Sequence, residues 1–103
     1  MKILTITVIP VSKTAEMSAL ADKIMAKRLP DVSDVAQYVC LSPPFDGIPP
    51  NSMVTISIAE VGSSESLAMT NYPLQLAGGE VRRIPIVEVP VGTSVETEKK
   101  YRG

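Results

Sequence analysis

Two adjacent arginines in the stretch VRRIP, Arg82 and Arg83, carry the clearest binding chemistry of this 103-residue chain. Because side chains alternate between the two faces of a strand, at most one of them can point into a covered interior. An arginine in that position would bind a carboxylate or a phosphate. The other interpretation is that both are exposed charges that protect a sheet edge from pairing with another chain.

Hydroxyl, phenol and amide groups elsewhere in the sequence can supply further hydrogen bonds to a ligand. Asn71 and Tyr72 precede Pro73, where they are placed to line the mouth of a pocket together with Arg83. The predicted ligand-binding residues are Thr5, Thr7, Tyr38, Ser57, Tyr72 and Arg83.

The composition argues against several kinds of catalytic site. The chain has no histidine and a single cysteine, Cys40. A reactive thiolate needs a cationic or histidine neighbour, so Cys40 is predicted to be a buried, apolar residue of a strand. The carboxylates show no metal-ligand spacing of the EF-hand kind. We therefore predict no catalytic residue, no metal and no cofactor, and leave open whether the protein is an enzyme.

Charge and hydropathy limit the partners and the compartment. A net charge of −1 and a pI near 5.3 give no basic surface for nucleic acid. No apolar run approaches the roughly 20 residues that span a bilayer, so we expect no membrane partner. Threonines interrupt the apolar opening MKILTITVIP, which favours a strand over a secretory signal. The expected compartment is cytoplasmic, because the single cysteine excludes an internal disulfide framework.

The first half of the chain predicts a strand, a helix and two further strands. Residues 2–9 alternate as a strand does, and residues 12–29 repeat apolar side chains at intervals of three and four, as a helix closed by Pro30 would. Residues 35–41 are rich in β-branched and aromatic residues, and residues 53–61 show the clearest alternation in the chain.

The second half predicts a helix, a last strand and a tail. Residues 62–79 begin with capping serines and end with paired glycines. Pro73 is expected to limit the helix to about two turns, followed by a kink or a second short turn. Residues 80–91 form a strand whose prolines place it at a sheet edge. Residues 1–92 are predicted to be one domain, and residues 93–103 a polar C-terminal tail that is frayed or orders on a partner.

The order β-α-β-β-α-β predicts an α+β fold, the ferredoxin-like sandwich, in which two helices cover one face of a four-stranded antiparallel sheet. Between the second and third strands, the proline loop (residues 43–50) holds four prolines, with Phe45, Asp46 and Gly47 at its tip. This loop is interpreted either as a stiff connector or as a lid or partner contact.

The helix-free face of this sheet is expected to need a cover. We assign to it a small, half-polar set of side chains that carries few charges, so a second copy packed about a two-fold axis is the predicted cover. The residues assigned to it are Thr5, Thr7, Tyr38, Thr55, Ser57, Val87 and Val89.

The order of elements, the size and the stretch SLAMTNYPLQLAGGEVRRIPIVEVP resemble the dimeric α+β barrel superfamily, of which this chain looks like a small uncharacterised member. The resemblance implies that two ferredoxin-like protomers pack their sheets into a barrel, with a cavity between helices and sheet or within the barrel. Members that bind haem or catalyse cyclisation rely on histidine, and the quinone-forming monooxygenases use a tryptophan. This chain has neither residue.

Three functions remain from these observations. The first is a homodimer that binds a small molecule or a protein partner without catalysis. The alternative is a cofactor-independent enzyme, monooxygenase- or isomerase-like, that acts on a small hydrophobic substrate through donors including Tyr38 and Arg83. The third is a regulatory module resembling amino-acid-binding ferredoxin-like domains, which pair edge to edge, although VIPVSKT lacks their glycine-rich turn.

Overall fold

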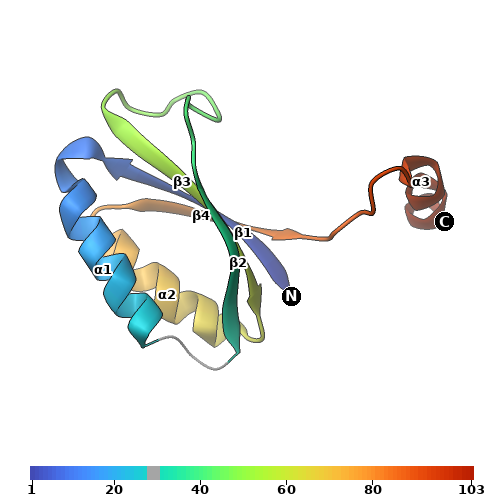
Figure 1. Ribbon diagram of the computed structural model, residues 1–103, viewed down its shortest axis with the longest axis horizontal. Helices are drawn as coiled ribbons and strands as arrows, with labels where there is room; N and C mark the ends of the chain where they lie inside the picture. The colour runs from blue at the N-terminus through green and yellow to red at the C-terminus, as the bar shows by residue number, and fades with distance from the viewer. Residues whose placement is uncertain (28–30) are drawn as a thin grey trace.

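The computed structural model describes residues 1–27 and 31–103. Within this part of the chain, four strands form one antiparallel sheet in the order β2-β3-β1-β4. This is the predicted ferredoxin-like arrangement, and α1 and α2 lie on the same face of the sheet (Figure 1). The elements are β1 (Lys2–Pro10), the 3₁₀ turn η1 (Val11–Lys13), α1 (Thr14–Ala26), β2 (Val32–Val39), β3 (Ser52–Val61), α2 (Ser64–Leu76), β4 (Glu80–Ile86) and α3 (Ser94–Arg102).

The strand register places the hydroxyl-bearing side chains beneath the helices. Thr5 lies opposite Ser57 and Thr7 opposite Thr55. Thr5 and Thr7 are only 6% and 8% exposed, and they line a cavity together with Met17 of α1. The prediction that the Thr5, Thr7, Thr55 and Ser57 side chains face away from the helices is therefore wrong.

The physical reason lies at one end of the same face. Ile3 of β1, Val32 of β2 and Val61 of β3 are buried there and pack with Leu67 of α2. These aliphatic side chains give the helices an apolar anchor, so the middle of the covered face can be polar. Alternation along a strand sorts residues into two faces, but it does not say which face the helices cover.

The helix-free face is aliphatic. One row across the sheet joins Ala36, Ile58, Leu4 and Ile84, and the next joins Tyr38, Ile56 and Ile6, with Arg82 beyond. We call this surface the open face, made of Leu4, Ile6, Ala36, Tyr38, Ile56, Ile58, Ile84 and Ile86.

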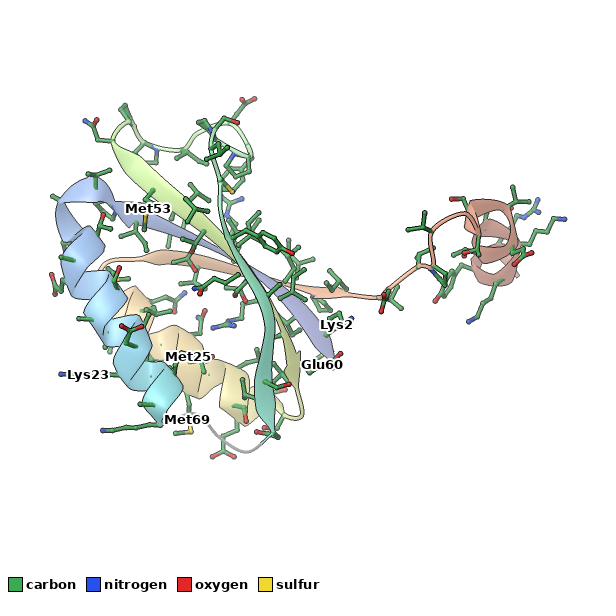
Figure 2. All side chains as sticks on the ribbon, viewed as in Figure 1. Lys2, Lys23, Met25, Met53, Glu60 and Met69 are labelled. Atoms are coloured by element: carbon green, nitrogen blue, oxygen red, sulfur yellow. The ribbon has the colours of Figure 1, made fainter. Side chains whose placement is uncertain are left out.

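Charged residues border the open face. Lys2 and Glu60 lie opposite each other at one end of β1 and β3 (Figure 2), and Lys2 also pairs with Glu88. Tyr38 and Ile84 are 57% and 45% exposed. The apolar centre with a charged border is the pattern of an association surface.

The proline loop folds back onto the sheet. The guanidinium of Arg82, on the far edge strand β4, lies 4.1 Å from the centre of the Phe45 ring and also pairs with Glu80 at 3.0 Å. Gly47, at φ 87°, provides the left-handed conformation that the tip of the loop needs. The loop is thus anchored by an aromatic contact with an arginine, and a role as a partner contact stays a prediction.

The end of α2 differs from the prediction. α2 does not stop or kink after two turns but continues through Pro73 to Leu76. A proline near the end of a helix removes one backbone donor while its fixed φ suits the helix, and Ala77 N still donates to Pro73 O at 3.1 Å. The predicted end of the first helix, up to Pro30, falls on residues 28–30, outside the described part of the chain.

The C-terminal tail contains a third helix. Within the predicted polar tail, residues 93–103, Ser94–Arg102 form α3, in which Arg102 pairs with Glu98 one turn earlier at 3.0 Å. β4 ends at Ile86, before the predicted Val91, and an extended linker carries α3 away from the sheet (Figure 1). No helix in the described residues is both long and apolar enough to cross a membrane.

Both edge strands are irregular. β2 has a bulge between Asp34 and Ala36, which twists an edge and interrupts its ladder. β4 carries Pro85 opposite Ile3, as expected for an edge strand.

A cluster of polar residues joins the start of β2 to the start of α2. The Ser66 hydroxyl, only 1% exposed, donates to Asp31 Oδ1 at 2.6 Å. Ser63 caps α2 by accepting from Ser66 N at 3.2 Å. Gly62 N donates to Asp31 O at 2.9 Å, and a Cβ at Gly62 would lie 2.8 Å from Asp31 Cβ. Glycine is therefore needed at this close approach.

The hydrogen bond from Ser66 makes the stability of this cluster dependent on pH. It lowers the pKa of Asp31, against a smaller raising effect of desolvation. A lowered folded-state pKa stabilises the protein above the unfolded-state pKa, about 3.9, and this contribution is lost as pH falls through the folded-state value. We predict that Ser66→Ala lowers the urea midpoint at pH 7, and that the difference from the wild type narrows towards about pH 2.

The control for this experiment is Ser64→Ala, since Ser64 is exposed at the start of α2. Its effect on the urea midpoint should not vary with pH. A difference between Ser66→Ala and the wild type that is equal at both ends of the pH range would show that the charge of Asp31 plays no part.

Candidate functional site

A cavity of about 430 Å³ lies between the two helices and the sheet. This volume falls within the range of roughly 300–1,000 Å³ typical of small-molecule sites. Both helices and all four strands contribute to its lining, which consists of Thr5, Thr7, Ile9, Met17, Ser18, Ala21, Asp22, Ile24, Met25, Val32, Gln37, Met53, Thr55, Ser57, Ala59, Thr70, Leu74 and Arg83.

The sheet side of the cavity is polar. Thr7, Thr55 and Ser57 line it, and within the described residues their hydroxyls make no side-chain hydrogen bond to the protein. Among the described residues no buried side-chain nitrogen or oxygen lacks a hydrogen-bond partner, so these hydroxyls open onto the cavity and can donate to or accept from a molecule placed there. This side of the cavity is therefore suited to a molecule with oxygen or nitrogen atoms.

The helix side of the cavity is apolar. Met17, Ala21, Ile24 and Met25 come from successive turns of α1, and Leu74 comes from α2. Met17 is 1% exposed. Lys23, on the other side of α1, is exposed and points away from the sheet (Figure 2). Methionine side chains adapt to irregular shapes, so this side can close on an apolar group.

Arg83 is the cation of the site, and three neutral groups hold its guanidinium. Nε donates to Asn71 Oδ1 at 3.0 Å, Nη1 to Thr5 Oγ1 at 2.9 Å, and Nη2 to Thr70 Oγ1 at 3.0 Å. Thr70 in turn donates to Leu67 O at 3.0 Å. The guanidinium is thus fixed in position by α2 and β1.

No described carboxylate neutralises this cation. Arg83 takes part in none of the ion pairs found among the described side chains. Burial lowers the pKa of the Arg83 guanidinium, although an arginine stays protonated at any physiological pH. Asp22 of α1 is exposed and also lines the cavity, but it is not paired with Arg83.

The structure brings four of the six predicted ligand-binding residues into this cavity and leaves two outside it. Thr5, Thr7, Ser57 and Arg83 are in the lining. Tyr38 lies opposite Ile56 on the open face, and Tyr72 is 63% exposed on α2. The donor role that the enzyme hypothesis gives to Tyr38 in this cavity is therefore not available to it.

Several lining residues were missed by the sequence prediction. Thr70 lies three residues after Leu67 and four before Leu74, so the 3.6-residue period places it on the inner side of α2. Gln37 lies opposite Ser57 and shares its face. Cys40, predicted to be buried, is half-buried and belongs to a separate pocket under the proline loop. No group of potential metal ligands occurs among the described residues.

Comparisons with known proteins leave the family open. The sequence matches no protein-family model and no curated protein. The de novo designed protein Foldit4 is similar over 84% of this chain and 98% of its own, with 8% identity and a TM-score of 0.49. A dabb family protein with a ferredoxin-like fold from Mesorhizobium loti is similar over 87% of this chain and 100% of its own, with 14% identity and a TM-score of 0.46.

Thr5 and Thr7 offer a matched test of how Arg83 is held. We predict that Thr5→Val destabilises the protein by roughly 1–3 kcal/mol, because it leaves an N–H of the half-buried guanidinium without an acceptor. Thr7→Val makes the same change of side chain on the same face of β1 but breaks no hydrogen bond to Arg83. It should therefore lower the free energy of unfolding by less than about 1 kcal/mol. Urea unfolding followed by circular dichroism measures both, and equal costs would contradict the assigned role of Thr5.

Proposed function

We propose that this protein is a homodimer that binds a small molecule in the cavity between its helices and its sheet. The main support for this proposal is Arg83. Its guanidinium lines a cavity of ligand size, and neutral groups hold each of its three nitrogens. No described carboxylate is paired with it. Keeping a charge in such a place lowers stability unless something offsets it. A bound ligand supplies that offset.

Binding is favoured over catalysis by the chemistry of the lining. The hydroxyls of Thr7, Thr55 and Ser57 and the amide of Gln37 donate and accept hydrogen bonds, which orients a ligand. Of the five donors that the enzyme hypothesis names, Tyr38 lies on the other face of the sheet, while the cavity is lined by Thr5, Thr7, Ser57 and Arg83. The groups that remain in the cavity recognise a molecule more readily than they transform it.

A ligand screen tests this proposal. A compound that binds the folded chain raises its melting temperature by mass action, and 100 times its Kd gives about 2.7 kcal/mol of stabilisation. We expect small organic molecules with an apolar part to raise the melting temperature of the wild type. The same compounds should raise that of Ala21→Trp much less, because an indole on the helix side fills part of the cavity.

Failure of a broad screen of such compounds would reject binding in this cavity. An equal rise for the wild type and Ala21→Trp would place the binding elsewhere on the molecule.

The open face supports the dimer. One apolar row extends across all four strands and the next across three of them, so a second sheet of the same kind fits this breadth better than a narrow peptide does. A two-fold axis places the same patch on both partners, and aliphatic side chains are complementary to themselves. We therefore still propose that a second copy of the chain covers the helix-free face, but this face is aliphatic and not the half-polar one that the sequence predicted.

A charge at the centre of the open face should separate the protomers. Ile58 lies between Leu4 and Ala36 in its row. The substitution Ile58→Lys would bury two unpaired ammonium groups, one from each protomer, in a symmetric interface. We predict that light scattering gives the wild type twice the 11.0 kDa mass of the chain and the variant a single chain mass.

The control is Lys23→Glu on the outer side of α1, which changes the charge more but should remain dimeric. A monomeric wild type at high protein concentration would reject the dimer and leave the proposal for the cavity standing.

A further inference from the structure

We propose that the ligand of the cavity is an amphipathic monocarboxylate, whose carboxylate binds the guanidinium of Arg83. This inference rests on the proposed function and specifies the chemical class of ligand. It starts from the hydrogen bonds that Arg83 makes and from those that it leaves free.

Arg83 keeps donors for one more group. An arginine has five N–H groups, of which one is on Nε and two are on each terminal nitrogen. The protein uses one on Nε, one on Nη1 and one on Nη2. One N–H therefore remains on each terminal nitrogen, without an acceptor among the described residues. Two N–H groups are what a carboxylate needs to bind with both of its oxygens.

The charges around the cavity favour a single negative charge. Arg83 and Asp22 are the two charged side chains in the described lining, and they have opposite signs. Asp22 repels any anion in the cavity, and it would repel a phosphate dianion about twice as strongly as a carboxylate at the same distance. A carboxylate matches the charge of Arg83 alone, so it is the anion that this lining accommodates best.

The rest of the lining defines the remainder of the ligand. Met17, Ile24, Met25 and Leu74 offer an apolar surface on the helix side. Thr7, Thr55 and Ser57 offer hydroxyls on the sheet side. A carboxylic acid with an apolar chain or ring satisfies both Arg83 and the helix side, and hydroxyl or carbonyl substituents on one edge would satisfy the sheet side.

Matched pairs of probes that differ only in charge test this inference. Octanoate is compared with octanamide, and 4-hydroxybenzoate with 4-hydroxybenzamide, by calorimetric titration of the wild type. Each carboxylate should bind about tenfold or more tightly than its amide, since a hydrogen bond to a charged group contributes more than a neutral one. Octyl phosphate should bind more weakly than octanoate.

Arg83→Met should lower the affinity for the carboxylates by about 30-fold or more, while the amides change much less. Arg82→Met is the matched control: it removes the same charge from the neighbouring position of β4, on the opposite face of the sheet, and should leave both affinities unchanged. Arg83→Lys keeps the charge but not the fork, and should give an intermediate loss. If Arg83→Met does not fold, the wild-type pairs and Arg83→Lys decide the question.

The outcomes separate this inference from the function on which it rests. Amides that bind the wild type as tightly as the carboxylates would overturn the carboxylate and leave binding in the cavity intact. Tighter binding of octyl phosphate would overturn it in favour of a phosphate ester. No binding of any probe would overturn the inference, and the broader ligand screen would then decide whether the cavity binds any small molecule.

Discussion

The alternation of side chains along paired strands is the constraint on which this structure depends. A single register between β1 and β3 places Thr5, Thr7, Thr55 and Ser57 on one face and Leu4, Ile6, Ile56 and Ile58 on the other. A shift by one residue would exchange the two faces completely. The helices cover the polar face, so the cavity with Arg83 and the aliphatic surface are separated by the thickness of one sheet. Ligand binding and self-association can therefore use different sides of the same four strands.

Covering the polar face has an energetic cost that shapes the domain. Of the described residues of α1, Met17 is the one that is buried. The space between this helix and the sheet is a cavity, not a packed core. Stability then depends on one end of the face, where Ile3, Val32 and Val61 pack with Leu67, and on the cluster of Asp31, Ser63 and Ser66. Functional sites commonly lower the stability of a protein in this way, because the space for a ligand is not filled by packed side chains.

The sequence was sufficient to predict the order of the four strands and of the two helices that cover the sheet, because each of these elements has its own period and end signals. It also predicted that Arg82 and Arg83 point to opposite faces, and that β4 is an edge strand. It could not predict which face the helices cover, since that depends on a few aliphatic contacts between distant parts of the chain. For the same reason Tyr38 was assigned to a ligand although it lies on the open face.

Local rules also failed in two places. Pro73 has the sequence signature of a break, but α2 is anchored at its other end by the Ser63 cap and continues past the proline. The charged residues after Thr93 were interpreted as a polar tail, frayed or ordered on a partner, and no helix was predicted there, yet Glu98 and Arg102 are spaced to pair across one helical turn. Thr70 could have been found from its helical spacing, whereas Gln37 required knowledge of the pairing between β2 and β3.

The irregular edges of the sheet determine how copies of this chain can assemble. The bulge in β2 and the proline in β4 hinder an incoming strand from adding to either side. Edge addition propagates without limit and leads to fibres, whereas contact between two identical faces is satisfied once and then stops. The chain can therefore expose a broad aliphatic face that pairs once with a second copy, while its irregular edge strands hinder the addition of further strands.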